Sequence, residues 1–307
     1  MTTDKPRNMP ASIRQRLLNH STETKTDPNL VLIWYGLERL LYRLSVSGYS
    51  DRFVLKGAML FRLWGNADFR PTKDLDLEGF VQNEAQALRE VFASVCTHPV
   101  EDDGLIFDAS SLMVAPIRET QEYGGLRVSL TARLGVAVLR LQVDVGFGDA
   151  ITPSPSTIEF PSILKQSRPR IRVYPKETVV AEKFEAMVQL GMTNSRMKDY
   201  YDLWFMSRHF EFEGSTLATA LRGTFDRRKT MIPQQAPVAL SLEYADDASH
   251  VRQWAAFIKR SGVEKSPGLD AVIDEVADFV LPPAFAAANE QPFDQQWKPP
   301  YRWRRVA

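Results

Sequence analysis

The segment Arg70–Phe80, RPTKDLDLEGF, sets two aspartates one residue apart between leucines, just after a proline and a threonine. Alternate side chains of an extended strand share a face, so Asp74 and Asp76 point one way while Leu75 and Leu77 point into a core. Two carboxylates about 4 Å apart repel by on the order of 4 kcal/mol at an effective dielectric near 20, so a fold that keeps both ionised usually supplies a cation. The segment therefore predicts a half-buried strand that presents a pair of carboxylates.

Two interpretations of this carboxylate pair are open. Mg²⁺ prefers hard oxygen ligands, commonly one or two carboxylates, and fills its other positions with water and substrate phosphates. Alternatively, the two aspartates, with Glu78 on the same side, lie on a solvated strand face or at a sheet edge. The D-x-D pattern alone does not separate a metal site from a solvated face.

A second strand carries another aspartate. In VLRLQVDVGFGD, residues 138–149, apolar residues alternate with mostly polar ones, and Asp144 falls on the polar face. If this strand lies beside the first, three carboxylates converge, an arrangement that can hold one or two metal ions over a phosphate during in-line displacement. As an isolated strand residue, Asp144 would instead lie at the surface. The GFGD sequence is not a dinucleotide fingerprint, because it lacks the third glycine and the helix start.

Helical periodicity singles out a lysine in the second half of the chain. In ETVVAEKFEAM, residues 177–187, Lys183 interrupts an otherwise apolar stripe. Its stem can pack while its ammonium reaches a cleft, or the residue can simply lie at the edge of the stripe. In the next helix, SRMKDYYDLWFM, Arg196, Asp199 and Asp202 are three residues apart, which an ion-pair ladder explains. The functional interpretation has Asp199 or Asp202 orient Lys183 or a nucleotide group.

The composition limits the class of protein. The 307 residues are 44% hydrophobic, and 38 basic side chains cancel 38 acidic ones, so the chain lacks the overall basic field typical of non-specific nucleic-acid binding. Cys96 is the only cysteine, which excludes an internal disulfide framework and fits a reducing compartment. No apolar run approaches the roughly 20 residues of a membrane span, and the first residues lack the apolar core of a signal peptide. We expect a cytoplasmic protein without a membrane partner.

The order of patterns predicts two lobes. Residues 1–165 alternate helical with strand-like segments, including a strand, a glycine turn and a helix within residues 53–64. Residues 166–307 are mostly helical in pattern. The proline- and serine-rich segment 151–170 is expected to mark the boundary between the lobes.

Five segments in combination resemble the nucleotidyltransferase family that includes the AbiEii/AbiGii and MenT toxins. In chain order they are VLKGAMLFRLW, FRPTKDLDLEGF, LQVDVGFGD, VYPKETVVAEKFEAMVQLGMTNSRMKDYYDLW and FDRRKT. The resemblance covers roughly residues 30–232. One departure is Ala58, which stands where many relatives have a second glycine, so that the turn near the phosphates is altered and an inactive or re-purposed member stays open.

The resemblance implies an α+β fold, with a DNA polymerase β-type core of mixed sheet and flanking helices and a mainly helical C-terminal lobe that completes the active-site cleft. It implies transfer of a nucleoside monophosphate from a nucleoside triphosphate to an acceptor hydroxyl, with Mg²⁺ or Mn²⁺ as cofactor. The metal ligands that it implies are Asp74, Asp76 and Asp144, and Lys183 and Asp199 complete the implied catalytic set. The implied nucleotide-binding residues are Lys56, Gly57, Thr72, Lys183, Arg196 and Asp202.

The acceptor follows from the resemblance and from local basic segments. Members of the family are toxins of toxin–antitoxin or abortive-infection systems, and several resemble transferases that act on the 3′ end of tRNA, so the resemblance implies a tRNA or other RNA acceptor and a cognate antitoxin. Aromatic and basic mixtures such as the tail WKPPYRWRRVA suit single-stranded RNA. Alternatively, the tail packs its aromatic rings on the helical lobe. The candidate RNA-binding residues are Arg222, Arg227, Arg228 and Lys229.

Two other functions remain open at this stage. A transferase that modifies a protein hydroxyl would use the same metal chemistry without needing basic patches. A catalytically silent module would bind a nucleotide or a partner and would not transfer the nucleotide.

Overall fold

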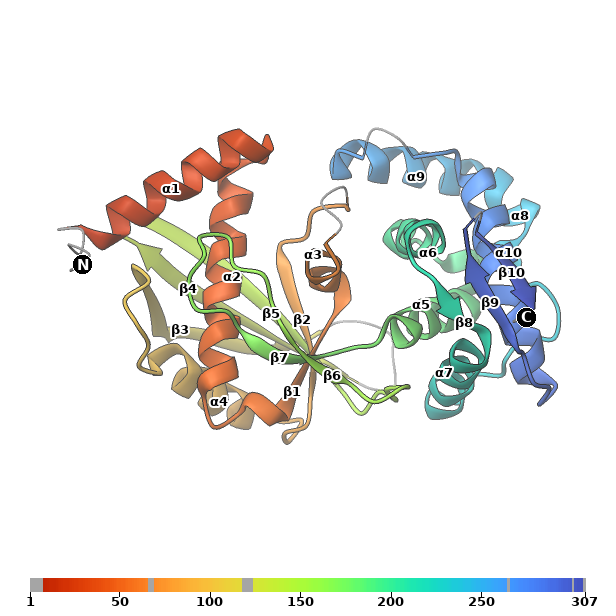
Figure 1. The fold of residues 1–307 in the computed structure, drawn as a ribbon, viewed down its shortest axis with the longest axis horizontal. Coiled ribbons are helices and arrows are strands. Elements are labelled where there is room, and N and C mark those ends of the chain that lie inside the picture. The colour runs from red at the N-terminus through yellow and green to blue at the C-terminus, as the bar shows by residue number, and fades with distance from the viewer. Residues whose placement is uncertain (1–7, 66–68, 118–123, 264–265, 300, 306–307) are drawn as a thin grey trace. The chain divides into compact units, whose positions relative to one another are not determined.

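The computed structural model describes residues 8–65, 69–117, 124–263, 266–299 and 301–305 (Figure 1). The chain divides into two compact units. The first unit comprises Met1–Ala67, Thr72–Gly148 and Ser156–Val173, and the second comprises Asp68–Pro71, Asp149–Pro155 and Tyr174–Ala307. The first unit thus extends past the expected boundary at residue 165, because the strand that ends at Val173 is part of its sheet.

A seven-stranded mixed sheet forms the centre of the first unit. Its strand order is β3-β4-β5-β2-β1-β7-β6. The strands are β1 (Phe53–Lys56), β2 (Asp74–Gly79), β3 (Leu105–Pro116), β4 (Leu126–Leu134), β5 (Ala137–Phe147), β6 (Ser156–Glu159) and β7 (Arg170–Val173). Strand β2 runs parallel to β5 and antiparallel to β1. The two strands on which the sequence placed the aspartates are therefore neighbours, and the expected mixed sheet with flanking helices is confirmed.

Helices α1 (Met9–Thr24), α2 (Pro28–Val46) and α4 (Ala85–Thr97) cover this sheet (Figure 1). Asp27 caps the first turn of α2 by accepting a hydrogen bond from the backbone N–H of Leu30 at 3.0 Å. A Cβ on Gly36 would lie 3.0 Å from methyl groups of Leu139 and Leu141, so α2 packs closely on the apolar face of β5. The alternating residues of β5, which include Asp144, lie on the opposite face.

The proline- and serine-rich segment 151–170, which the sequence predicted as the boundary between the lobes, contains a strand. Residues Ser156–Glu159 form β6, which pairs antiparallel with β7 at the edge of the sheet. All four residues of β6 are exposed, so the strand lacks the apolar alternation by which a strand is recognised in sequence. Residues 151–155 belong to the second unit, where the Thr152 N–H donates to Thr178 Oγ1 at 2.9 Å.

The second unit is mainly helical, as the sequence predicted. Its α-helices are α5 (Lys176–Leu190), α6 (Met197–His209), α7 (Gly214–Arg227), α8 (Leu242–Asp246), α9 (Ala248–Ser261) and α10 (Leu269–Ala288). Helix α7 packs on α5 and α10, and α10 also packs on α6. A small sheet of order β10-β9-β8 joins the C-terminal residues to the segment before α7; its strands are β8 (Phe212–Glu213), β9 (Gln295–Lys298) and β10 (Arg302–Arg305).

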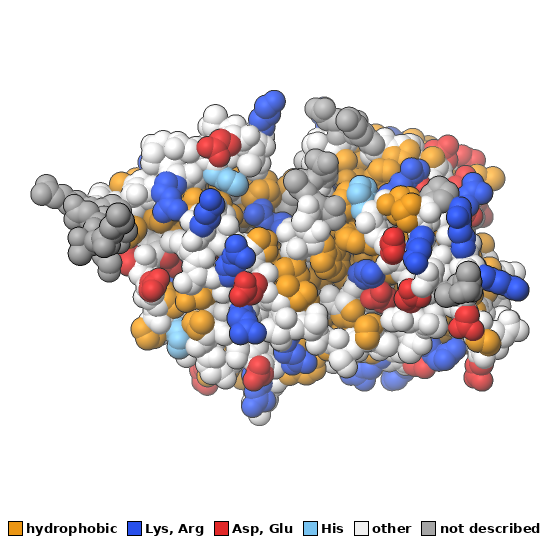
Figure 2. Space-filling view, viewed as in Figure 1, with side chains coloured by type: hydrophobic (Ala, Val, Ile, Leu, Met, Phe, Trp, Pro, Cys, Tyr) orange, Lys and Arg blue, Asp and Glu red, His pale blue; other side chains and the backbone are white. Residues whose placement is uncertain are grey.

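The surface agrees with the balanced composition. On the face drawn in Figure 2, basic and acidic side chains are interspersed. No helix within the described residues is both long enough and apolar enough to cross a membrane.

Candidate functional site

The first unit brings three predicted metal ligands onto two adjacent strands. The register of β2 and β5 places Asp76 opposite Asp144 and Asp74 opposite Gln142. Neighbouring strands lie about 4.8 Å apart, and residues paired in register point to the same face of a sheet. Asp74 precedes Asp76 by two residues and shares that face. The carboxylates of Asp74, Asp76 and Asp144 therefore project from one side of the sheet, opposite the helices that cover its apolar face.

Two cations flank these aspartates in the same register. Lys56 of β1 lies opposite Asp76, and Arg127 of β4 lies opposite Asp144, which completes a row across four strands. Arg127 donates from Nε and Nη2 to the two carboxylate oxygens of Asp144, each at 2.8 Å. Lys56 Nζ lies 3.0 Å from Oε2 of the fully buried Glu78. One cation thus lies at each end of the two central carboxylates, so this row is not a purely acidic patch.

A glycine turn lies against the central aspartate. Strand β1 ends at Lys56, and the chain turns through the short helix Gly57–Met59 into α3 (Leu60–Leu63), as the sequence predicted. Gly57 has φ +70°, and a Cβ on it would lie 2.6 Å from the Cγ of Asp76. A Cβ on Gly146 would lie 3.1 Å from Lys56 Nζ. The glycines therefore allow the backbone to approach the carboxylate row closely, at a place where any larger residue would displace Asp76.

We expect Gly57→Ala to displace the Asp76 carboxylate and to destabilise the first unit. The left-handed backbone costs a residue with a Cβ about 1–2 kcal/mol, and the overlap with Asp76 adds to this cost. Denaturant unfolding should show the loss of stability, and nucleotide transfer should fall with it. Gly48→Ala is the matched control, because nothing lies within 4 Å of a Cβ at Gly48. Equal stability of the two variants would contradict the contact between Gly57 and Asp76.

Thr72 shapes the entry into β2. Its hydroxyl lies 3.4 Å from the Asp74 amide nitrogen, and its carbonyl accepts a hydrogen bond from the Trp34 indole N–H at 2.7 Å. Trp34 belongs to α2 and also carries the Arg62 guanidinium 4.0 Å above its ring. Thr72, one of the predicted nucleotide-binding residues, is therefore held against α2 immediately before β2 begins.

The donor chemistry of this row fits a hard divalent cation. Asp74 and Asp76 offer carboxylate oxygens, and Mg²⁺ commonly uses only one or two protein carboxylates. Gly57 lies directly against the Asp76 carboxylate, where a residue with a Cβ would overlap it. Within the described residues, no three His, Cys, Asp or Glu side chains converge enough to hold a metal ion, and the third predicted ligand, Asp144, is paired with Arg127. By donor type, Asp74 and Asp76 suit such a cation, whereas Asp144 would first have to exchange Arg127 for it.

The second unit contains the other group of predicted residues, joined in one ion-pair cluster. Lys183 of α5 lies between two aspartates of α6, with Nζ 2.6 Å from Asp199 and 2.7 Å from Asp202. Arg196 donates from Nε to Asp199 at 2.6 Å, which confirms that part of the predicted ion-pair ladder. Arg70 donates from Nε and Nη2 to the two carboxylate oxygens of Asp202, at 2.6 and 2.7 Å. Each aspartate therefore holds Lys183 together with one arginine.

The accessible atoms of this cluster belong to its cations. The side chains of Asp199 and Asp202 are each 1% exposed, whereas those of Arg70, Lys183 and Arg196 are 11%, 14% and 32% exposed. Burial by itself raises the pKa of Asp199, but Lys183 and Arg196 outweigh it and hold that pKa well below its usual range. Burial likewise lowers the pKa of Lys183, and Asp199 and Asp202 reverse this effect and raise it. The aspartates are thus placed to orient cations.

Arg70 binds α6 through Asp202, and its short segment, which precedes β2 in the chain, belongs to the second unit. Its neighbour Phe69 packs edge-on against Phe205 of α6, with the ring centroids 5.1 Å apart. Three residues separate Arg70 from Asp74 in the chain. No local spacing in the sequence indicates this partner of Arg70, because Asp202 lies 132 residues away.

The candidate RNA-binding residues differ in their surroundings. Arg228 is 13% exposed and is surrounded by Asp149, Glu182 and Glu185, at 3.0, 3.6 and 2.8 Å. These carboxylates bind its guanidinium inside the second unit. The surroundings of Arg228 are therefore those of a residue that stabilises the fold. Arg222 is half-buried, and Arg227 and Lys229 are exposed.

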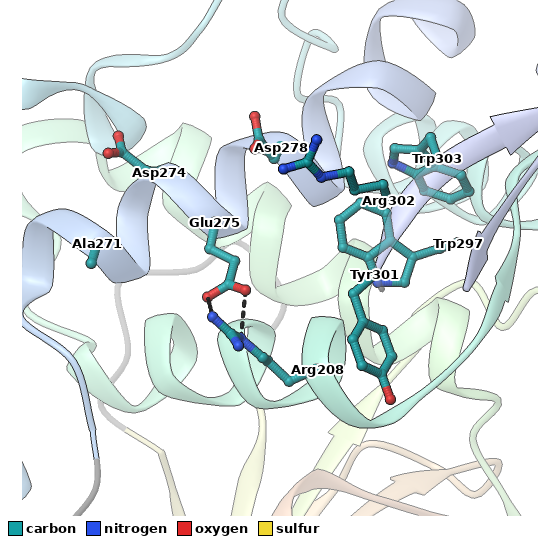
Figure 3. A pocket seen from close by; sticks show the side chains of 9 residues that line it. All are labelled: Arg208, Ala271, Asp274, Glu275, Asp278, Trp297, Tyr301, Arg302 and Trp303. Atoms are coloured by element: carbon teal, nitrogen blue, oxygen red, sulfur yellow. Dashed lines mark hydrogen bonds and ion pairs between the residues drawn. The ribbon is translucent and has the colours of Figure 1, made fainter. Parts of the chain in front are cut away.

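The aromatic tail packs on the second unit. Trp297 is 2% exposed, and its indole N–H donates to Ser207 O at 2.6 Å; the Trp303 indole N–H donates to Phe279 O at 2.9 Å. Both rings are therefore part of the fold, which favours the packing alternative for this segment. They line a pocket of about 540 Å³, in which Arg208 pairs with Glu275 (Figure 3). The pocket is lined by Arg208, Ala271, Asp274, Glu275, Asp278, Trp297, Tyr301, Arg302 and Trp303.

Comparisons with known proteins cover most of the chain. Two crystal structures from Helicobacter pylori are similar to it: a protein described as a candidate nucleotidyltransferase, at 17% identity over 89% of this chain and 95% of that one, and JHP933, at 17% identity over 89% and 92%. The TM-score is 0.45 for each. No curated protein matches the chain. The family described as the nucleotidyl transferase AbiEii toxin of type IV toxin–antitoxin systems matches residues 39–288. This match spans most of the chain and every site residue from Lys56 to Lys229, and so the chain belongs to the AbiEii family of nucleotidyltransferase toxins.

Proposed function

We propose that this nucleotidyltransferase requires Mg²⁺ or Mn²⁺ and transfers a nucleoside monophosphate from a nucleoside triphosphate to a hydroxyl of an RNA. The observation that carries the metal dependence is the pairing of Asp76 with Asp144 across β2 and β5, with Asp74 on the same face. Carboxylates that project from one face of adjacent strands are suitable ligands for the divalent ion of a metal-assisted phosphoryl transfer.

Asp74 and Asp76 are the residues that would hold the metal ion. A bound divalent ion neutralises charge at the α-phosphate and favours departure of pyrophosphate. Gly57 allows the chain to approach this site closely, and Lys56 lies beside Asp76 in the register, where its ammonium pairs with Glu78. In this proposal Lys56 and Thr72 orient the phosphates relative to the carboxylates.

The exposed cations of the second-unit cluster suit an anionic ligand such as a triphosphate. Asp199 and Asp202 fix the position of Lys183, and the exposed part of the cluster is cationic, as an anionic ligand requires. We assign Lys183 and Arg196 to phosphate binding. Asp199 and Asp202 act through them as positioning residues, since both carboxylates are buried and committed to ion pairs.

The RNA acceptor is supported by two exposed basic residues that suit phosphate contacts, Arg227 at the end of α7 and Lys229 just after it. The tail tryptophans do not add to this support, because they are packed in the fold. A nucleoside triphosphate and RNA are both cytoplasmic, so we place the reaction there. A type IV toxin system also implies a cognate antitoxin as a partner.

Incubation of the purified protein with each α-³²P-labelled nucleoside triphosphate and MgCl₂, together with either total tRNA or cell protein, tests this function. We expect the label in RNA, sensitive to ribonuclease and lost when EDTA is added. Label in protein instead would support modification of a protein hydroxyl. Binding of triphosphate without transfer to either acceptor would support a silent module and overturn the proposal.

A further inference from the structure

The pair of Arg127 and Asp144 occupies the third carboxylate of the row. The guanidinium donates to both carboxylate oxygens at 2.8 Å, in the forked geometry that gives strong and directional pairing. Both side chains lie on the face that carries Asp74 and Asp76, because Arg127 is in register with Asp144 and Asp144 with Asp76. The residue that most directly neutralises Asp144 is thus part of the candidate site itself.

A divalent cation and this guanidinium compete for the same oxygens. A metal ion bound by Asp144 would lie within a few ångströms of the Arg127 charge, and like charges at this distance repel strongly. The arginine has room to move, since its side chain is 43% exposed while that of Asp144 is 19% exposed. Solvent screens a pair with this exposure, so we expect displacement of Arg127 to cost about 1 kcal/mol, the upper end of the range for exposed pairs, in keeping with its bidentate geometry.

The displaced guanidinium would remain on this face of the sheet, because β4 fixes its backbone next to β5. An arginine there is suited to bidentate contact with phosphate oxygens. The neighbouring residues of β4 on the same face, Ser129 and Thr131, are uncharged, so Arg127 is the cation that this part of the strand offers.

We propose that Arg127 holds Asp144 in the free protein, competes there with the divalent cation, and changes partner to the phosphates of the bound nucleoside triphosphate. This inference rests on the proposed metal-dependent function and adds to it a residue that couples metal binding to nucleotide binding. It predicts opposite effects of one substitution: loss of Arg127 strengthens metal binding without nucleotide and weakens nucleotide binding with metal.

Titration of the full chain with Mn²⁺, followed by the electron paramagnetic resonance signal of free Mn²⁺, tests the first effect without any turnover. We expect Arg127→Met to lower the dissociation constant for Mn²⁺ about fivefold, the equivalent of an exposed ion pair of about 1 kcal/mol. Arg133→Met is the matched control, because Arg133 lies on the same strand and face and is exposed, and it should leave the constant unchanged. Asp144→Asn should raise the constant.

Binding of a non-hydrolysable triphosphate analogue in saturating Mn²⁺ tests the second effect. We expect Arg127→Met to weaken it about tenfold or more, as for loss of a charged hydrogen bond, and Arg127→Lys to recover part of the loss. Unchanged or weaker Mn²⁺ binding by both Arg127→Met and Arg127→Gln, with thermal melts like that of the natural protein, would overturn the competition. Absence of saturable Mn²⁺ binding to the natural protein would instead overturn the proposed metal site, which separates the two failures.

Discussion

We expect Asp76→Asn to reduce nucleotide transfer by on the order of 1,000-fold or more while the protein remains folded, because the substitution removes a charge from the centre of the carboxylate row. Asparagine has nearly the shape of aspartate, so it can remain beside Gly57. The amide offers a metal ion one neutral oxygen in place of a charged carboxylate. Initial rates with labelled triphosphate and RNA, measured at several MgCl₂ concentrations, give the effect.

Glu159→Gln is the matched control for this variant. It also neutralises a strand carboxylate of the first unit, but Glu159 lies on the edge strand β6, where its side chain is 57% exposed. We expect its transfer rate to equal that of the natural protein. Circular dichroism and a thermal melt should show both variants folded. Transfer by folded Asp76→Asn within about tenfold of the natural rate would show that Asp76 does not bind the metal ion, since loss of such a ligand costs far more.

We also expect Asp199→Asn to lower the free energy of unfolding by a large amount. The change leaves Lys183 with one carboxylate instead of two and removes the buried 2.6 Å partner of Arg196. Loss of one member of a buried ion pair costs about 3–5 kcal/mol, and we expect about 3 kcal/mol because Asp202 still holds Lys183. Denaturant unfolding at pH 7 measures this loss. Glu159→Gln again serves as a control and should cost less than about 0.5 kcal/mol, as exposed pairs do.

The pH dependence of this loss identifies its electrostatic origin. Lys183 and Arg196 hold the pKa of Asp199 below its usual range in the folded protein despite burial, whereas an unfolded aspartate titrates near pH 3.9. A carboxyl group with a lower folded pKa contributes stability above its unfolded pKa, and this contribution is lost as the pH falls towards the folded pKa. The difference in unfolding free energy between the natural protein and Asp199→Asn should therefore be full at pH 5–7 and shrink below about pH 4.

A difference that stays constant from pH 7 to pH 3 would contradict this origin and would assign the loss to packing. The raised pKa of Lys183 acts in the opposite range, since its contribution is present below the unfolded lysine pKa near 10.4 and is lost as the pH rises through the folded value. The Lys183 contribution therefore does not change the loss of stability that we expect below about pH 4. If Asp199→Asn also weakens triphosphate binding, Lys183→Met should show a similar weakening, because the proposal has Asp199 act through that ammonium.

Alternation and helical periodicity predicted much of this fold because both are local properties. The strict alternation around Asp144 gave the correct strand and the correct buried face, with Leu139, Leu141 and Val143 all in the core. The stripe interrupted by Lys183 likewise predicted a helix with a cation on its packed side. By contrast, the sequence pattern did not predict β6, which lies in a segment rich in proline and serine, because an exposed edge strand has no apolar alternation.

Sequence spacing predicted few of the side chains with which the site residues pair. Sequence spacing connected Arg196 with Asp199, three residues apart on one helix, but it could not connect Arg70 with Asp202 or Arg127 with Asp144. A cross-strand or interhelical partner depends on which strands pair and in which register, and charges distant in the chain carry no local signal of that choice. The sequence also could not show that Arg228 is surrounded by carboxylates from α5 and from the segment after β5.

By itself, the sequence determined the types of chemical group, the strands and helices that carry them, and the family resemblance. The tertiary structure alone decided that Asp76 stands beside Asp144, that Arg127 holds Asp144, and that two buried aspartates hold Lys183. The physical reason is that backbone periodicity arises between near neighbours in the chain, whereas ion pairing and carboxylate convergence arise between residues brought together only when the sheet and the helices pack.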